Sequence, residues 1–422
     1  MNPLKKSIPW VLRAVVGVLL IVSPVIAGSV DSNTAAQVGS ARELLQRGEY
    51  EKGIEQLREA YQLFPFNPTF KRSLAEGYAA FGNHQFKQKR FEQADESFNK
   101  VLELYPEDSG TILMRGICNY HLKKYDVARY ELERAKAIKP DSVEVLYFLG
   151  LVEIDTDHIP HALELLEQAL KRAPGRKEIA ELLVKTRKEN TVESGMDRGH
   201  SSRFDLTYDP GVDSAFARSI LSVLESAANV IGAELGLFPE ARIPVRIYKR
   251  ADYKTVTDSP GWSGGFYDGK IRLPFGAMNE VTPGIRGILF HEYAHVVVFE
   301  LTRGNCPLWL NEGIAEMFGR TQYNRALPKI DKSKLVGFKK LETSFKDFST
   351  ANATLAYQQS YSLVNYLVET YGWHRVKQIL TGLGGGLSFD ESIVAALKDY
   401  DLNYETLVKE WRTSLEKESS EK

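Results

Sequence analysis

The stretch LFHEYAHVVVFELTRGNCPLWLNEGIAEMF, residues 289–318, places histidines and glutamates in otherwise apolar surroundings. Burying a charged group without a partner is costly, so such a cluster usually binds a metal ion or pairs internally. His291 and His295 are four residues apart, and on a helix this spacing puts both imidazoles on one face, where they can reach the same ion. Glu292 would then lie beside a water on that ion. The stretch predicts a metal site on a helix from about Gly284 to Leu301.

Two further glutamates follow on a short amphipathic segment. Glu312 comes 16 intervening residues after His295, in WLNEGIAE, and Glu316 lies one helical turn further on. Here the sequence resembles the gluzincin metallopeptidases, the thermolysin-like and aminopeptidase N-like families, in which the Glu of an Asn-Glu-Gly or Asn-Glu-Ala step completes a zinc site. The resemblance implies one Zn²⁺ held by His291, His295 and Glu312. It also implies that Glu316 orients the first histidine, which fixes its tautomer.

The resemblance continues into YQQSYSLVNYLVETYG, residues 357–372. Aminopeptidase N-like enzymes carry a tyrosine at the start of a similar helix, where it stabilises the oxyanion. Tyr357 stands at that position, and Tyr361 is a weaker substitute. A phenol can donate a hydrogen bond to the negative oxygen that forms during attack. This hydrogen bond stabilises the oxyanion most strongly in a site that little water enters. That Tyr357 only packs in the core is the open alternative.

The predicted function is peptide-bond hydrolysis by a zinc-activated water, with Glu292 as the general base. GAMNE, residues 276–280, resembles the Gly-Ala-Met-Glu-Asn motif by which aminopeptidases hold a substrate's amino terminus, but its last two residues are reversed. Exopeptidase activity therefore loses its main support. GGFYDGKIRL, residues 264–273, can instead pair with an extended substrate, which suits an endopeptidase. The alternative is an exported scaffold or assembly factor whose zinc is structural.

A small sheet is predicted before the metal-binding stretch. Residues 203–209 and 243–250 read as strands, with a helical pattern over about 212–235 between them. Asp268-Gly269 predicts a two-residue hairpin turn with positive φ angles. Beyond residue 284 the patterns are helical almost to the end of the chain. We therefore expect an α+β, zincin-type metallopeptidase domain over residues 203–418.

The N-terminal half repeats every 34 residues. Small and apolar residues recur at fixed distances before each proline, because small residues let paired helices approach and proline ends the second helix. The recurring residues are Pro106, Pro140 and Pro174; Phe91, Tyr125 and Ile159; Ala94, Ala128 and Ala162; Phe98, Leu132 and Leu166; and Gly116 and Gly150. This pattern resembles a tetratricopeptide (TPR) array.

An earlier copy of the repeat ends at Pro65, 41 residues before the next proline. The seven extra residues equal two helical turns, so we expect a lengthened helix around Gly77 to Lys89. Residues 176–189 predict a polar capping helix. The fold prediction is an α-helical TPR solenoid over residues 36–190, a linker over 191–202, and the peptidase domain. Such an array binds a substrate or a protein partner on its concave face, or serves as a spacer.

The ends and the composition limit the remaining possibilities. Lys5 and Lys6 precede an apolar stretch, residues 14–27, so residues 1–28 predict a signal peptide, or a membrane anchor formed by residues 8–27. We expect an exported protein, periplasmic or extracellular. The 54 basic and 55 acidic residues nearly balance, so the net charge does not favour binding to nucleic acid. Cys118 and Cys306 lie in different predicted domains, which argues against a disulfide framework.

Overall fold

The computed structural model describes residues 32–257, 264–322, 330, 334–342, 345 and 348–420. The chain divides into two compact units between Asn190 and Thr191. The predicted leader, residues 1–28, lies outside the described residues. Among the helices that are described, none is both long enough and apolar enough to span a bilayer.

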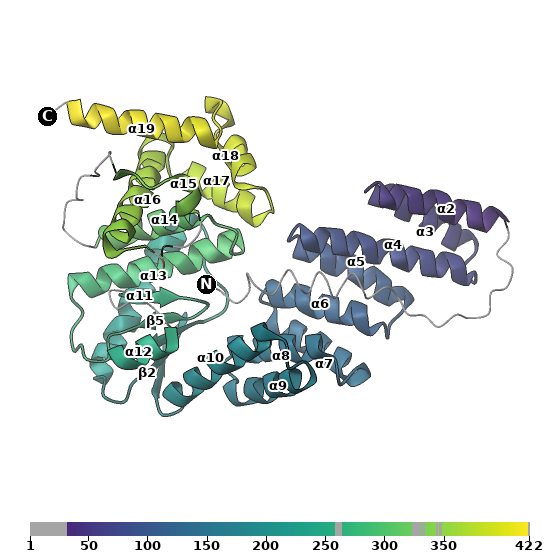
Figure 1. Ribbon diagram of the computed structural model, residues 1–422, viewed down its shortest axis with the longest axis horizontal. Coiled ribbons are helices and arrows are strands. Elements are labelled where there is room, and N and C mark those ends of the chain that lie inside the picture. Colours follow the sequence, from purple (N-terminus) through teal and green to yellow (C-terminus); the bar gives the residue numbers. More distant parts are fainter. Residues whose placement is uncertain are drawn as a thin grey trace. The chain divides into compact units, whose positions relative to one another are not determined.

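The first unit is a row of antiparallel helix pairs (Figure 1), as the 34-residue repeat predicts. Gly116 and Gly150 are the points of closest approach within two pairs, because a Cβ there would lie 2.7 Å from Leu132 and 3.0 Å from Leu166. The helices are α2 Ser32–Gln46, α3 Tyr50–Leu63, α4 Pro68–Lys87, α5 Phe91–Leu104, α6 Ser109–His121, α7 Tyr125–Ile138, α8 Val143–Asp155, α9 Ile159–Arg172 and α10 Lys177–Glu193.

Helix α4 is the lengthened helix. It has 20 residues, whereas its counterparts α6 and α8 have 13 each. The helix starts at Pro68 rather than near Gly77. Asn67 caps this start by accepting a hydrogen bond from the backbone N–H of Thr69 at 2.9 Å. The prediction of two extra turns in this helix is confirmed.

The second unit contains a five-stranded mixed sheet in the order β1-β2-β3-β5-β4. The β2–β3 and β3–β5 pairs are parallel, and the outer strands β1 and β4 pair antiparallel with β2 and β5. The strands are β1 Asp197–His200, β2 Phe204–Tyr208, β3 Ile243–Ile247, β4 Phe266–Tyr267 and β5 Ile271–Leu273.

Residues 191–202, predicted as a linker, contain the end of α10 and strand β1, which pairs with β2 although its sequence is polar. The prediction of a two-residue turn between β4 and β5 is wrong. The β4–β5 connection has three residues, Asp268 to Lys270, and of these only Gly269 has a positive φ, +107°. A two-residue turn of type I′ would need positive φ at both Asp268 and Gly269.

Helices cover the sheet and form the rest of the second unit. The core brings together α11, α13, α14, α16 and α17 with β2, β3 and β5, through residues such as Leu224, Val297 and Leu363. The helices are α11 Ser214–Leu235, α12 Arg250–Thr257, α13 Pro283–Thr302, α14 Leu308–Arg320, α15 Phe338–Leu341, α16 Thr350–Tyr371, α17 Trp373–Gly384, α18 Phe389–Ala396 and α19 Tyr404–Ser420, with a 3-10 turn, η2, at Lys398–Tyr400.

Buried charges lie within the second unit beside the sheet. Arg246 and Arg272 are neighbours on β3 and β5, and each is 2% exposed. Glu193, the last residue of α10, pairs with Arg246 at 2.9 Å and with Arg272 at 3.3 Å, and accepts a hydrogen bond from Tyr248. Burial works to raise the pKa of Glu193, but Lys270, the two arginines and Tyr248 lower it to about 2.

Candidate metal centre

Two packed helices carry the predicted ligands. Helix α13 starts at Pro283, where the Thr282 hydroxyl accepts a hydrogen bond from the backbone N–H of Ile285 at 3.2 Å. His291 and His295 lie on successive turns of this helix, and α14 supplies Glu312 and Glu316 in the same way. Both pairs are four residues apart, so each helix presents its two side chains on one face.

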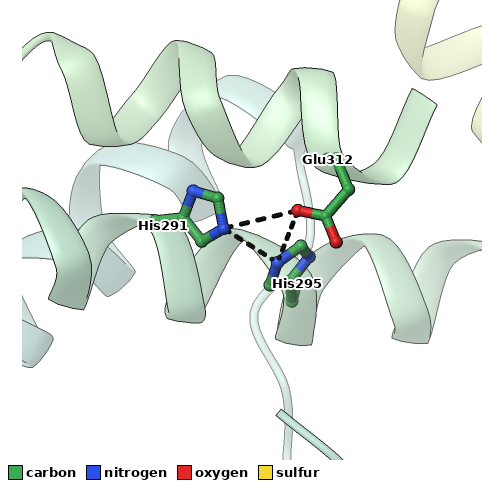
Figure 2. Close-up of side chains that lie close together, drawn as sticks. All are labelled: His291, His295 and Glu312. Carbon is green, nitrogen blue, oxygen red and sulfur yellow. Dashed lines mark hydrogen bonds and ion pairs between the residues drawn. The ribbon is translucent and has the colours of Figure 1, made fainter. Parts of the chain in front are cut away.

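The three predicted ligands meet (Figure 2). The Nε2 atoms of His291 and His295 are 3.1 Å apart, and each lies 3.5 Å from Oε2 of Glu312. One ligand atom from each residue falls within 4.8 Å of the others, a group that can hold a metal ion. This Oε2 accepts no hydrogen bond from the described residues, as expected of an oxygen whose partner is an ion.

The other ring nitrogens are held by side-chain oxygens. Glu316 Oε1 lies 3.5 Å from Nδ1 of His291, and Oε2 of the same carboxylate accepts from Nε of Arg320 at 2.6 Å. Asn311 Oδ1 lies 3.0 Å from Nδ1 of His295. With its Nδ1–H donated to Asn311, His295 directs the Nε2 lone pair into the group, and the Glu316 carboxylate near Nδ1 favours the same tautomer of His291.

Asn311 was not singled out from the sequence, although it stands in the quoted Asn-Glu-Gly step. Its side chain can reach His295 because α14 packs against α13 in the observed register. The residue spacing within one helix does not predict this contact between two helices. The sequence signal for Asn311 was its place directly before Glu312, the predicted carboxylate ligand.

Electrostatics in the group follow from burial and close charges. Burial works to raise the pKa of Glu312, but His295 and His291 lower it to about 2. Burial also works to lower the pKa of His295, and the carboxylate of Glu312 raises it to about 9. The carboxylate of Glu312 is therefore held in its charged form, which is the form that binds a metal ion.

Glu292 is buried beside the three ligands. Its Oε2 has no hydrogen-bond partner among the described residues, and burial raises the pKa of the carboxyl. Gly265, just before β4, makes room for it, because a Cβ at that position would lie 2.5 Å from Oε1 of Glu292. Gly265 belongs to the stretch of residues 264–273 that was predicted as a strand, and its contact with the site was not predicted.

The two candidate tyrosines have different surroundings on α16. Burial and the charges of Glu312, Glu292 and Glu316 raise the pKa of Tyr357, so its phenol lies within the field of the site. Its ring also packs edge-on against Phe345, with ring centroids 5.4 Å apart. The ring of Tyr361 instead lies under the guanidinium of Arg320, 5.5 Å from its centroid.

A glycine sets the approach of α13 and α14. A Cβ at Gly319 would lie 3.0 Å from the carbonyl oxygen of Gly287 and 3.2 Å from Cβ of His291. These distances are tighter than ordinary carbon contacts, so a side chain at position 319 would require the two helices to shift by a few tenths of an ångström.

Part of the chain is similar to curated proteins. It is 23% identical over 141 residues to the Protein CTR9 homolog of Arabidopsis thaliana, a match that covers 32% of this chain and 12% of that protein. It is 28% identical over 110 residues to human mitochondrial import receptor subunit TOM70, which covers 26% of this chain and 18% of that protein. The chain thus spans less than a fifth of either relative.

Solved structures show the same kind of likeness. A tetratricopeptide repeat protein from Parabacteroides merdae covers 73% of this chain and 96% of its own, at 15% identity and a TM-score of 0.33. MamA from Desulfovibrio magneticus covers 38% of this chain and 87% of its own, at 20% identity and a TM-score of 0.31.

Two family profiles match the chain. Residues 38–85 and 79–143 match tetratricopeptide repeats, and residues 229–417 match the Peptidase MA superfamily. The second match includes all three residues of the metal-binding group. This protein therefore carries tetratricopeptide repeats followed by a domain of the Peptidase MA superfamily.

Proposed function

We propose that the protein is a zinc-dependent peptidase. One observation carries the proposal: two imidazole nitrogens and a carboxylate oxygen converge beside a second buried carboxylate, Glu292, that has an unpartnered oxygen. A metal site with three protein ligands leaves a coordination position for chemistry. The match to the Peptidase MA superfamily agrees with this reading.

The donor set fits zinc. Two neutral imidazoles and one carboxylate are typical zinc ligands, whereas calcium and magnesium prefer oxygen atoms throughout. His291, His295 and Glu312 would hold the ion, while Glu316 and Asn311 keep the rings oriented. The chemistry that Zn²⁺ supplies when bound is that of a Lewis acid, which polarises a carbonyl group and makes water more acidic.

Glu292 serves as the proton carrier in this mechanism. Its carboxylate accepts a proton from the water that attacks the peptide carbonyl, and then gives that proton to the departing amine. The role requires a carboxylate with a lone pair that is not committed to another donor, and Oε2 has no hydrogen-bond partner in the described chain. Gly265 leaves space for the side chain on the side of β4.

Tyr357 stabilises the oxyanion that forms during attack. Its phenol lies within the field of Glu312 and Glu292, and burial favours the neutral, donating form. Tyr361 is less suited to this role, since its ring lies under Arg320. If Tyr357 serves only to pack against Phe345, its hydroxyl can be removed without affecting hydrolysis.

An extended substrate lies along β4 in this proposal. Among the described strands β4 lies at one of the two edges of the sheet, and the residue before it, Gly265, adjoins Glu292. Pairing of a peptide with an edge strand holds the main chain extended and places no demand on a free amino terminus. This arrangement suits an endopeptidase.

The repeats recruit a protein in this proposal. Tetratricopeptide arrays present a concave surface to peptides or proteins, and either the substrate or an adaptor can occupy it here. Export to the periplasm or the extracellular space, suggested by residues 1–28, belongs to the same proposal.

Replacement of Glu292 tests the proposal. The full chain and Glu292→Gln, matched in zinc content, are incubated with a mixed peptide library, and products are identified by mass spectrometry. We expect hydrolysis to fall by about 10²–10⁴-fold in the variant while zinc content is unchanged. Glu300→Gln, on the same helix α13, is the matched control and should retain activity.

Two outcomes would count against the proposal. If the wild-type chain with bound zinc cleaves nothing in the library, the metal is structural and the scaffold alternative gains. If Glu292→Gln cleaves as fast as the wild-type chain, Glu292 is not the proton carrier and the mechanism is wrong.

A further inference from the structure

Strand β4, along which the substrate lies in the proposed function, is too short to be stable through its own pairing. It has two residues, and it pairs with β5 at Phe266↔Arg272 and Tyr267↔Ile271. A two-stranded hairpin is marginally stable in water even when it is longer than this. Contacts of the side chains must therefore fix the position of this strand.

One face of β4 lies against α13 and the candidate metal centre. Successive side chains of a strand point to opposite faces, so position 265 and Tyr267 face one way and Phe266 faces the other. A Cβ at Gly265 would lie 2.5 Å from Oε1 of Glu292. The rings of Tyr267 and Phe299 meet edge-on, with centroids 6.1 Å apart. This face of the strand therefore adjoins the proposed proton carrier.

Charged side chains lie on the opposite face, beside Phe266. Arg272 is the residue of β5 directly opposite Phe266, so their side chains share this face. Nε of Arg272 donates to Oδ1 of Asp268 at 3.0 Å, and the two side chains are 2% and 4% exposed. Nη1 of Arg272 lies 3.3 Å from Oε1 of Glu193. We call Glu193, Arg272 and Asp268 the charge chain.

The charge chain joins the β4–β5 connection to the interior of the second unit. Asp268 directly follows β4, and Glu193 also pairs with Arg246 on β3 at 2.9 Å. The Tyr248 hydroxyl accepts from Nη1 of Arg272 at 2.6 Å and donates to Glu193. These contacts fix Arg272 from the side of the sheet, and Arg272 in turn fixes Asp268.

Stability alone does not account for buried charges at this place. Taking an ion pair out of water can cost more than the pairing returns, and apolar side chains of similar volume are often as stabilising or more so. A guanidinium and a carboxylate, however, bond in a directed way that apolar contacts lack. The charge chain is therefore suited to holding a short strand in one position.

We propose that the charge chain positions β4 to receive the main chain of an extended peptide substrate, with Asp268 as a positioning residue. Strand β4 lies at an edge of the described sheet, and Phe266 and Tyr267 are half-buried. A peptide binds more tightly to an edge that is already in place, because less ordering accompanies binding. The role toward substrate rests on the proposed function, whereas the hold of Asp268 on β4 can be measured without it.

Hydrogen–deuterium exchange of Asp268→Asn tests that hold. The substitution removes the charge that faces Arg272 and keeps the size of the side chain. In the zinc-loaded full chain, exchange in residues 264–273 should be faster by about 10–100-fold, the effect of losing a hydrogen bond between charged groups. Zinc content and exchange in α11 should equal those of the wild-type chain, which would show that the domain is folded.

Steady-state hydrolysis by the same variant tests the role toward substrate. With a peptide long enough to run along β4, KM should rise by about 10-fold and kcat should stay near the wild-type value, because this pairing stabilises ground state and transition state equally. With a short blocked peptide that spans only the scissile bond, KM should not change.

Asp205→Asn is the matched control for both measurements. Asp205 lies on β2 of the same sheet and pairs with Arg242 at 3.4 Å, but the two side chains are 53% and 50% exposed. Exposed ion pairs of this kind contribute little. Exchange in residues 264–273 and KM for both peptides should therefore equal the wild-type values.

Four results would overturn the proposal in different ways. Unchanged exchange in residues 264–273 of Asp268→Asn would mean that Asp268 does not hold β4. Faster exchange throughout the second unit would mean that the charge chain stabilises the whole domain. Faster local exchange with the same KM change for long and short peptides would mean that the substrate does not use β4. A wild-type chain that cleaves no peptide would refute the proposed function and the role toward substrate with it, while the exchange result would still show whether Asp268 holds the strand.

Discussion

Replacement of Gly265 by alanine should impair hydrolysis without touching a metal ligand. A Cβ at this position would lie 2.5 Å from Oε1, 2.7 Å from Cγ and 2.8 Å from Cδ of Glu292. Non-bonded carbon and oxygen atoms rest at about 3.5 Å, so the carboxylate or the backbone before β4 must move by about 1 Å. The three atoms nearest to this methyl group all belong to Glu292, and none belongs to His291, His295 or Glu312.

The size of the effect follows from that displacement. A misplacement of about 1 Å in a positioned catalytic group can cost about 10²-fold in rate. This corresponds to about 2.7 kcal/mol of activation free energy. On the proposed mechanism, kcat for Gly265→Ala therefore falls about 100-fold, while zinc content stays equal to that of the wild-type chain.

The assay compares initial rates on one peptide substrate taken from the library, with zinc measured in the same samples. Gly284→Ala, in the first turn of α13, is the control, because a Cβ there would lie at an ordinary 3.6 Å from the nearest atom, Thr282 Oγ1. Wild-type kcat in Gly265→Ala at equal zinc would refute the assignment of Glu292, since its carboxylate could then be displaced without consequence.

Three further predictions test other contacts. Tyr357→Phe should lower kcat by about 10²–10³-fold with little change in KM, whereas Tyr361→Phe should leave kcat near the wild-type value; equal effects in steady-state kinetics would contradict the assignment. Asn311→Leu should weaken zinc binding by about 10–100-fold, measured by competition with a chelator; unchanged affinity would mean that the amide does not support the histidine. Glu193 has a folded-state pKa of about 2, below its ordinary 4.5, so its stabilising contribution is present above pH 4.5 and is lost as pH falls toward 2. Denaturant titrations should show this acid loss in the wild-type chain and a flatter profile in Glu193→Gln; parallel profiles would exclude Glu193 as its source.

The sequence predicted those parts of the fold that depend on local repetition. The 34-residue spacing of proline and glycine predicts the helix pairs because each pair buries the same positions. Strand β1, residues 197–200, was missed, since four polar residues show no alternation and are held by pairing with β2. The burial of Arg246 was also missed. It depends on a partner, Glu193, that lies 53 residues away in the sequence.

The candidate site was predictable where one helix carries the pattern. The helical spacing of His291 and His295 predicts that they can reach one ion, and the resemblance to the gluzincins adds Glu312. The structure brings the three residues together. Asn311 and Gly265 were missed because their contacts depend on how α14 and the segment before β4 lie against α13. Tertiary packing of this kind leaves no periodic signal in the sequence.

The close approach of α13 and α14 at Gly319 bears on which ions the protein accepts. An alanine there would force the helices apart by a few tenths of an ångström, since its Cβ would lie 3.0 Å from a carbonyl oxygen on α13. Metal–ligand distances in a well-formed site hold to within about 0.2 Å. An alanine at position 319, which contributes no ligand atom, is therefore expected to alter the distances between the proposed ligands on α13 and α14 by a comparable amount.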